Sequence, residues 1–239
     1  RLPDIIEGFA ASIDTAAWVV LLLMFELETS VLDERHSGKQ VRWALHGLRA
    51  FCYSFIVYAF YGYLTKMLFL TETDSLLNIT NICTLADGTW AYAIDLDEYE
   101  IITAENCARF SAATSFLQFP GLSAVVDNDG FVEIFRLSWV DVINSAVWLF
   151  VVLVLEIDIR LQERNRLEGL FLRISNFSKS ILYAILFFAA IYWGLKGDFV
   201  DFWDAFLWLV AFIFIELNVF DWRQELLEDH SLKQDILPY

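Results

Sequence analysis

Five long, almost wholly apolar stretches constrain this chain more than any other feature of its sequence. The hydrocarbon core of a bilayer is about 30 Å thick, and about 20 mostly apolar helical residues are needed to cross it. The stretches occupy residues 10–32, 43–66, 138–159, 178–196 and 202–221. We therefore predict an all-α, polytopic membrane protein with five transmembrane helices.

The composition excludes several other classes of protein. Hydrophobic residues make up 58% of the 239 residues, whereas soluble globular chains hold about 45–50%. This hydrophobicity, with only 3 Pro and 10 Gly, excludes a disordered or collagen-like chain. The net charge of -16 argues against a nucleic-acid partner, because phosphates require a basic surface. No enzyme motif, cofactor motif or metal-ligand spacing stands out, so we predict no catalysis, cofactor or metal.

The distribution of Lys and Arg predicts the orientation of the chain. Most of these residues lie in the connection between the first two stretches, the connection between the third and fourth, and the C-terminal tail. Because cytoplasmic connections are enriched in Lys and Arg, we expect these segments in the cytoplasm. The N-terminus is then outside and the C-terminus inside, in a plasma membrane or a bacterial inner membrane.

The predicted organisation is a helical hairpin that occurs twice, followed by one further helix. The parts are the first hairpin (1–66), an extracytoplasmic insert (67–137), the second hairpin (138–196), the fifth helix (197–222) and a cytoplasmic tail (223–239). Within the second hairpin, Leu and Ile mix with Arg and Glu over 160–176. This pattern predicts an amphipathic cytoplasmic extension of the third span, which lies on the inner membrane surface or against a neighbouring subunit.

The insert is small, acidic and placed outside the membrane. It holds Cys83 and Cys107, and an oxidising exterior favours a disulfide between them over two free thiols. Alternating apolar residues predict a strand over 91–97, and 131–135 is a candidate for a second strand.

Two short motifs lie in the same insert. Residues 119–121 read Phe-Pro-Gly, which is typical of a turn. Asn78 begins a glycosylation sequence that matters only in a eukaryotic secretory pathway.

One spacing recurs in the first, third and fifth predicted helices. An Asp or Asn is followed by Trp four residues later, by Glu eight residues after the Trp, and then by a second polar residue. The three copies are Asp14, Trp18, Glu26 and Glu28; Asn144, Trp148, Glu156 and Asp158; and Asp204, Trp208, Glu216 and Asn218. The offset between the first two copies also superimposes Arg49 on Lys179 and Tyr53 on Tyr183. We interpret this pattern as a parallel internal repeat of the hairpin, with the fifth helix as a third copy of its first member.

The repeated acids lie too deep to reach water by position alone. The Glu follows the Asp or Asn by twelve helical steps, which span about 18 Å, a distance shorter than the hydrocarbon core. A carboxylate at the centre of a transmembrane helix costs at least about 2.5–3.5 kcal/mol. The acids are therefore expected to face the bundle interior, a water-filled cavity or cationic partners.

Two polar layers follow from this geometry. We predict an inner layer, rich in acid, of Glu26, Arg49, Glu156, Lys179 and Glu216. We predict an outer layer of Asp14, Asp141, Asn144, Asp201 and Asp204. We expect Arg49 beside Glu26 and Glu28, Lys179 beside Glu156 and Asp158, and Glu216 without a base from a following span.

Three functions remain open for these layers. In the first, the polar pairs and the three Trp serve helix packing alone, with the Trp as interfacial residues. Alternatively, Glu26, Glu156 and Glu216 form an inner constriction, and Asp14, Asp141 and Asp204 an outer mouth, for protons or small cations. The third possibility is a non-catalytic accessory subunit of a larger membrane complex. We take proton or cation translocation, within an oligomer, as the leading interpretation, and an accessory or assembly subunit as the alternative.

Overall fold

The computed structural model describes residues 15–24, 39–76, 79, 81–95, 98–110, 115–163 and 169–235. For residues 39–42, 163 and 218–235 it describes the backbone alone. The protein is mostly helical, as predicted. The described helices are Thr15–Met24, α2 (Lys39–Leu70), α3 (Asn128–Glu163), α4 (Leu170–Lys196) and α5 (Phe199–Asp235).

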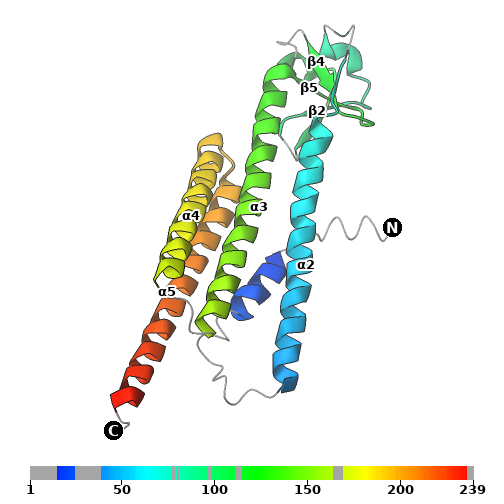
Figure 1. The fold of residues 1–239 in the computed structure, drawn as a ribbon. Helices are drawn as coiled ribbons and strands as arrows, with labels where there is room; N and C mark the ends of the chain where they lie inside the picture. The colour runs from blue at the N-terminus through cyan, green and yellow to red at the C-terminus, as the bar shows by residue number, and fades with distance from the viewer. Residues whose placement is uncertain are drawn as a thin grey trace. The chain divides into compact units, whose positions relative to one another are not determined.

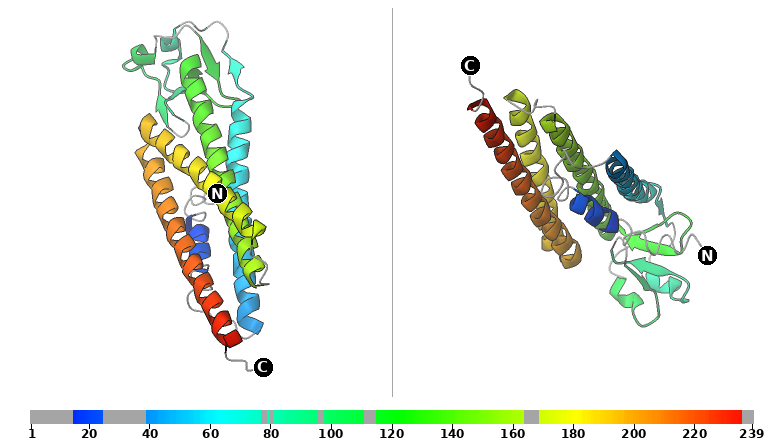
Figure 2. Two further views of the ribbon diagram at one scale, coloured as in Figure 1. Left: turned by 60° about the vertical axis from the view of Figure 1, so that its left-hand side comes forward. Right: turned by 90° about the horizontal axis from the view of Figure 1, so that it is seen from below.

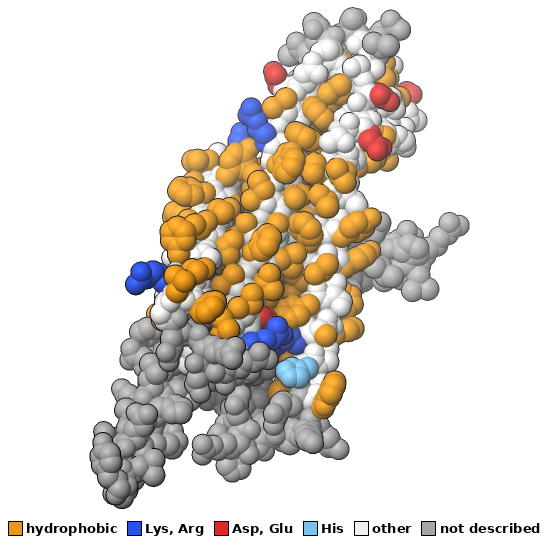
Figure 3. Space-filling view, viewed as in Figure 1, with side chains coloured by type: hydrophobic (Ala, Val, Ile, Leu, Met, Phe, Trp, Pro, Cys, Tyr) orange, Lys and Arg blue, Asp and Glu red, His pale blue; other side chains and the backbone are white. Residues whose placement is uncertain are grey.

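Two of the described helices are long and apolar enough to cross a membrane. They correspond to α3, over Asn128–Gln162, and α4, over Gly169–Lys196. Figure 3 shows hydrophobic side chains over most of the visible helical surface, with charged side chains few and scattered. Large apolar side chains of α4, such as Phe188 and Leu195, are exposed, which suits a helix that contacts lipid. Two membrane-crossing helices are thus supported, and the other three spans stay predictions.

The chain folds into two compact units. Unit 1 comprises Arg1–Ala59 and Val147–Tyr239, and unit 2 comprises Phe60–Ala146. Because the boundaries fall within α2 and α3, each of these helices contributes residues to both units.

Unit 1 is a helical bundle. Within it, α3 lies between α2 on one side and α4 with α5 on the other (Figure 1 and Figure 2). Its core contains Leu21, Val151, Leu186 and Phe212, from four different helices. The helices α4 and α5 are joined by a tight turn at Gly197, whose φ of 89° favours glycine because a side chain is strained there.

Unit 2 is built around a five-stranded sheet. The strands are β1 (Asp74–Ser75), β2 (Ala91–Ala93), β3 (Tyr99–Ile101), β4 (Phe116–Gln118) and β5 (Ala124–Asp127). Their order is β1-β4-β5-β2-β3, and all pairs are antiparallel except the parallel pair β2–β5. One cluster on the sheet includes Ala93, Phe119 and Val126 with Leu70 of α2 and Ile134 of α3. A second cluster packs the short 3-10 helices Ile82–Leu85 and Cys107–Phe110 against Val125 and Phe116.

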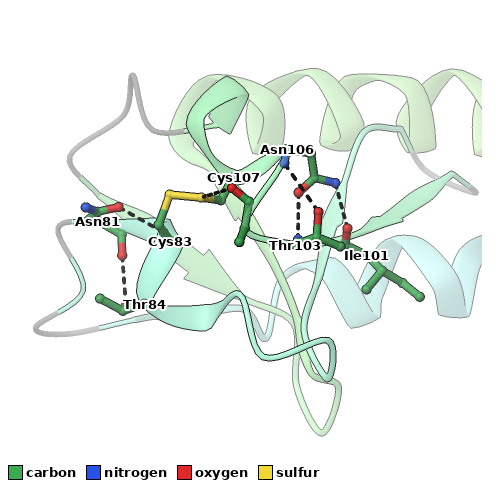
Figure 4. Close-up of a disulfide and its surroundings, with 8 residues drawn as sticks. Asn81, Cys83, Thr84, Ile101, Thr103, Asn106 and Cys107 are labelled. Carbon is green, nitrogen blue, oxygen red and sulfur yellow. Dashed lines mark hydrogen bonds between the residues drawn. A yellow bond between two sulfur atoms is a disulfide. The ribbon is translucent and has the colours of Figure 1, made fainter.

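The predicted disulfide between Cys83 and Cys107 is confirmed. It joins the two 3-10 helices, with the Cα atoms 5.0 Å apart (Figure 4). The Asn81 side chain accepts a hydrogen bond from the Cys83 amide at 2.9 Å. The Asn106 side chain accepts from the Thr103 amide at 2.7 Å and donates to the Ile101 carbonyl at 2.8 Å. The disulfide thus joins two segments whose backbones are also hydrogen-bonded by the side chains of Asn81 and Asn106.

The strand predicted over 131–135 is wrong, because α3 begins at Asn128 and includes these residues. The Asp127 side chain accepts a hydrogen bond from the Gly130 amide at 2.6 Å and so caps the first turn of the helix. Phe131 and Phe135 stack with ring centroids 6.0 Å apart, which is the contact that residues four apart make on a helix.

The other local predictions have mixed outcomes. The strand over 91–97 is confirmed in part by β2, and the turn at 119–121 is confirmed, with Gly121 at a φ of 69°. The amphipathic cytoplasmic extension over 160–176 stays a prediction, and its described residues lie at the end of α3 and around the start of α4. Helix α3 ends at Glu163 and α4 begins at Leu170, after Gly169 with a φ of 57°. Asn78 lies outside the described residues.

Candidate functional site

The candidate site is a charged network within unit 1. We use this name for three bases and three acids that come from four helices. The members are Arg49 of α2, Glu156, Asp158 and Arg160 of α3, Lys179 of α4 and Glu216 of α5. Four of the six are almost completely buried, namely Arg49, Glu156, Asp158 and Lys179. Burial of this kind is rare for charged side chains unless they are paired.

Helix geometry explains how α3 serves two neighbours. Glu156 and Asp158 are two residues apart, and two helical steps rotate a side chain by about 200°. The two carboxylates therefore leave opposite sides of α3. Glu156 meets α2 and Asp158 meets α4, in agreement with the position of α3 between them (Figure 1).

Glu156 is bound by two bases and a hydroxyl. Arg49 Nη1 lies 2.8 Å from Glu156 Oε1, and the Tyr53 hydroxyl donates a hydrogen bond to the same oxygen at 2.5 Å. Arg160 Nη2 lies 3.0 Å from Oε2. Arg49 and Tyr53 are four residues apart on α2, so both reach the carboxylate from one face of that helix.

Lys179 bridges two carboxylates from different helices. Its Nζ lies 3.0 Å from Asp158 Oδ2 of α3 and 2.8 Å from Glu216 Oε2 of α5. The Ser175 hydroxyl donates to Asp158 Oδ2 at 2.6 Å, and the Tyr183 hydroxyl donates to Glu216 Oε1 at 3.4 Å. One ammonium group with three donors thus connects three helices.

The two halves of the network follow one pattern. In each, a base and a Tyr four residues later bind a Glu of the repeated motif on another helix. The pairs are Arg49 and Tyr53 on Glu156, and Lys179 and Tyr183 on Glu216. In both cases the base comes from the helix that precedes the acid in the chain.

These partners differ in part from those expected from the sequence. Lys179 contacts Asp158, as expected, whereas Glu156 is bound by Arg49 and Arg160 instead. Glu216 receives Lys179 from the preceding helix α4, a source that the sequence reasoning did not consider. Glu26 lies outside the described residues.

The charges within the described network are balanced, with three bases and three acids. The excess of acid predicted for the inner layer includes Glu26, which lies outside the described residues. Moving an ion into a low-dielectric interior costs several kcal/mol, and only close, hydrogen-bonded pairing recovers that cost. The contacts between 2.8 and 3.0 Å supply such pairing.

The three Trp residues of the repeated motif converge in unit 1. The ring centroid of Trp18 lies 6.0 Å from that of Trp148 and 6.2 Å from that of Trp208. Phe212 of α5 lies 4.7 Å from Trp148. Trp148 is buried in the core of unit 1, where it packs against other helices, and the interfacial alternative for the three Trp residues stays a prediction.

The described residues of the predicted outer layer do not all belong to the same unit. Asp141 and Asn144 belong to unit 2, and Asp204 belongs to unit 1. Asp201 and Asp204 are exposed, and Asp204 Oδ1 accepts a hydrogen bond from Trp208 of its own helix at 3.2 Å. Asp14 lies outside the described residues.

Sequence reasoning missed several members of the site. Tyr53 and Tyr183 were matched by the repeat but were not assigned to a polar layer, although their spacing from Arg49 and Lys179 indicates a shared helical face. Ser175 lies four residues before Lys179 and Arg160 four residues after Glu156, so the same spacing could have identified both. Among the described residues, no group of three or more His, Cys, Asp or Glu could hold a metal ion.

Comparison with known proteins gives no relative. No protein family, no curated protein and no solved structure matches the chain.

Proposed function

We propose that the protein is a five-span membrane protein that works as a non-catalytic assembly subunit, with paired charges locking its helices together. The observation that carries the proposal is that Glu156, Asp158 and Glu216 each lie within 3.0 Å of a basic group from the same chain. Polar pairing between helices is a general means of association in membranes. The geometry therefore favours the role of a scaffold over that of a pathway for metal ions.

The same contacts support the proposed internal repeat. If the chain is two hairpins and one further helix, equivalent residues should make equivalent contacts. Arg49 with Tyr53 and Lys179 with Tyr183 do so, each binding a motif Glu. The meeting of the three motif Trp residues supports three copies of the first helix.

A selective pathway for metal cations fits this arrangement less well. Acidic rings select cations because their oxygen atoms replace the water around the ion. Here the oxygens of Glu156 and Glu216 are already bound by Arg49 and Lys179. A permeating metal ion would have to break buried ion pairs, each at a cost of about 3–5 kcal/mol.

Proton translocation is the second candidate, and one observation favours it. Ser175, Asp158, Lys179, Glu216 and Tyr183 form a continuous series of hydrogen bonds from α3 to α5. The side chain of Glu216 is 23% exposed, whereas those of Lys179 and Asp158 are 8% and 3% exposed. A proton can pass between such groups without entry of a hydrated ion.

The proposed orientation places unit 2 outside the membrane. Its disulfide is favoured by an oxidising compartment. The N-terminus is then outside and the C-terminus cytoplasmic. In this arrangement unit 2 is a docking surface for other subunits, or for a second copy of the chain, on the outer side of the membrane.

Flux measurements on the purified protein in liposomes separate the two candidates. For an assembly subunit, proton and potassium flux should equal that of protein-free liposomes. Native gels of a mild detergent extract should show a stable assembly larger than the 27.7 kDa chain.

A matched pair of variants identifies the alternative. Proton flux that Glu216→Gln abolishes, and that Glu105→Gln leaves unchanged, would overturn the scaffold role in favour of proton translocation. Glu105 is an exposed acid of unit 2, so its substitution controls for the loss of a negative charge.

A further inference from the structure

Aromatic and basic side chains gather at one depth along the two helices of unit 2. The end of α2 carries Tyr61, Tyr63 and Lys66, and the start of α3 carries Arg136 and Trp139. Both Tyr side chains and Trp139 are exposed. Trp and Tyr are enriched where hydrocarbon meets headgroups, and Lys and Arg extend toward that boundary. The outer hydrocarbon boundary is therefore expected near Lys66 and Trp139.

One face of the sheet lies a short distance beyond that level. This face, formed by Ala93, Phe119 and Val126, packs on Leu70 and Ile134. At 1.5 Å per residue, Leu70 lies about 6 Å beyond Lys66, and Ile134 lies about 7.5 Å beyond Trp139. The headgroup region adds about 5–8 Å on each side of the hydrocarbon core. Both helices thus place this face of the sheet at the height of the headgroups.

The edge strand β3 presents apolar side chains on that same face. Tyr99 pairs with Ala93 and Ile101 with Ala91, and cross-strand partners point to the same side of a sheet. The Tyr99 ring also lies 6.4 Å from that of Phe119. Tyr99 and Ile101 are nevertheless 46% and 58% exposed, so the apolar face continues beyond the part that the helices cover.

The acid of β3 is turned away from this face. Glu100 lies between Tyr99 and Ile101, and successive side chains of a strand point to opposite sides. Its carboxylate is 3.3 Å from Arg109 Nη2 and accepts a hydrogen bond from the Asn106 side chain at 2.9 Å. The side of β3 that bears Tyr99 and Ile101 is therefore suited to lipid, and the opposite side to water.

We propose that the Tyr99 and Ile101 side of β3 rests in the outer headgroup layer of the bilayer. Unit 2 is then held by its two helices and also by direct contact of its sheet with lipid. This inference rests on the membrane-spanning part of the proposed function. It assigns lipid to this side of β3 alone, and the docking of other subunits or of a second copy is left to the other surfaces of unit 2.

Fluorescence quenching at single labelled cysteines tests the proposal in the full chain. In a Cys52→Ala background with the disulfide intact, a polarity-sensitive fluorophore is attached at Ile101→Cys, with Asp129→Cys as the matched control. Asp129 is an exposed residue of unit 2, about 15 Å beyond Trp139 along α3 and so above the headgroups. The liposomes contain phosphatidylcholine with a nitroxide on the headgroup.

The expected result is several-fold stronger quenching at Ile101 than at Asp129. Equal, weak quenching at both positions would overturn the proposal, and would fit a partner protein or water at this surface. Should the first variant not fold, Tyr99→Cys reports from the same side of the strand.

A third label distinguishes failure of this inference from failure of the proposed spans. Phe150→Cys, at an exposed apolar position of α3, is measured with a nitroxide on the acyl chain. Strong quenching at Phe150 with none at Ile101 would reject lipid contact by the sheet and would leave the membrane span in place. Absence of quenching at Phe150 would reject the membrane span and the inference with it.

Discussion

Removal of the Lys179 ammonium group should destabilise unit 1 far more than removal of an exposed charge. Lys179→Met leaves Asp158 buried without its base and deprives Glu216 of its 2.8 Å partner. Breaking a buried pair from one side costs about 3–5 kcal/mol. For a chain of this length, the shift in Tm is about 2–4 °C per kcal/mol, which predicts a fall of about 6–20 °C.

Arg160 provides the matched control for that variant. Its side chain is 64% exposed and pairs with Glu156 four residues earlier on the same helix. Glu156 is buried but keeps Arg49 as its partner when Arg160 is lost. The expected cost is therefore about 0.3–0.5 kcal/mol, as for pairs four residues apart on a helix, and Arg160→Met should lower the Tm by about 2 °C or less. Thermal unfolding of both variants in the same detergent, followed by circular dichroism, gives the comparison.

A variant without these charges tests whether the fall in Tm of Lys179→Met has an electrostatic cause. Lys179→Met combined with Asp158→Asn and Glu216→Gln removes the base and both carboxylate charges, and should recover most of the lost Tm. A Lys179→Met variant no more destabilised than Arg160→Met would show that the buried ion pairs do not stabilise unit 1. A triple variant as unstable as Lys179→Met would show that shape and packing explain the effect.

Two further predictions concern unit 2. Replacing Cys83 and Cys107 by Ser opens a loop with a sequence separation of 24 residues, which should cost about 3–4 kcal/mol of chain entropy; urea unfolding with no change in midpoint would contradict this. Burial, together with the nearby Asp127 carboxylate, raises the pKa of Tyr92 from 10.0 to about 12. The stability that this raised pKa contributes is present below about pH 10 and is lost as the pH rises to about 12, because Tyr92 ionises first in the unfolded chain. Tyr92→Phe should therefore show a shallower fall of unfolding free energy over that range, and an unchanged slope would count against the assignment.

The sequence was most informative where a local pattern decides the structure. Runs of apolar residues predicted helices, and the spacing of the motif predicted that Trp18, Trp148 and Trp208 play equivalent roles. Cys83 and Cys107 were predicted to pair from their compartment alone. Such features depend on periodicity or chemistry that a single stretch of chain contains.

Contacts between distant segments could not be derived in the same way. The sequence placed Arg49 and Lys179 at the level of the acids, but the choice of partner depends on which helices pack together. The opposite directions of Glu156 and Asp158 from α3 follow from helix geometry, yet they identify no neighbour. The error at 131–135 has a local cause, since five mostly apolar residues fit a strand or a helix equally well.

The most direct test of paired charges between helices is a double-mutant cycle on Arg49 and Glu156. Unfolding free energies are measured for Arg49→Met, Glu156→Gln and the double variant in one detergent. Because the two side chains lie 2.8 Å apart and are buried, we expect an interaction energy of about 1–3 kcal/mol. Effects that add to within about 0.5 kcal/mol would contradict it, because α2 and α3 would then not be joined by this ion pair.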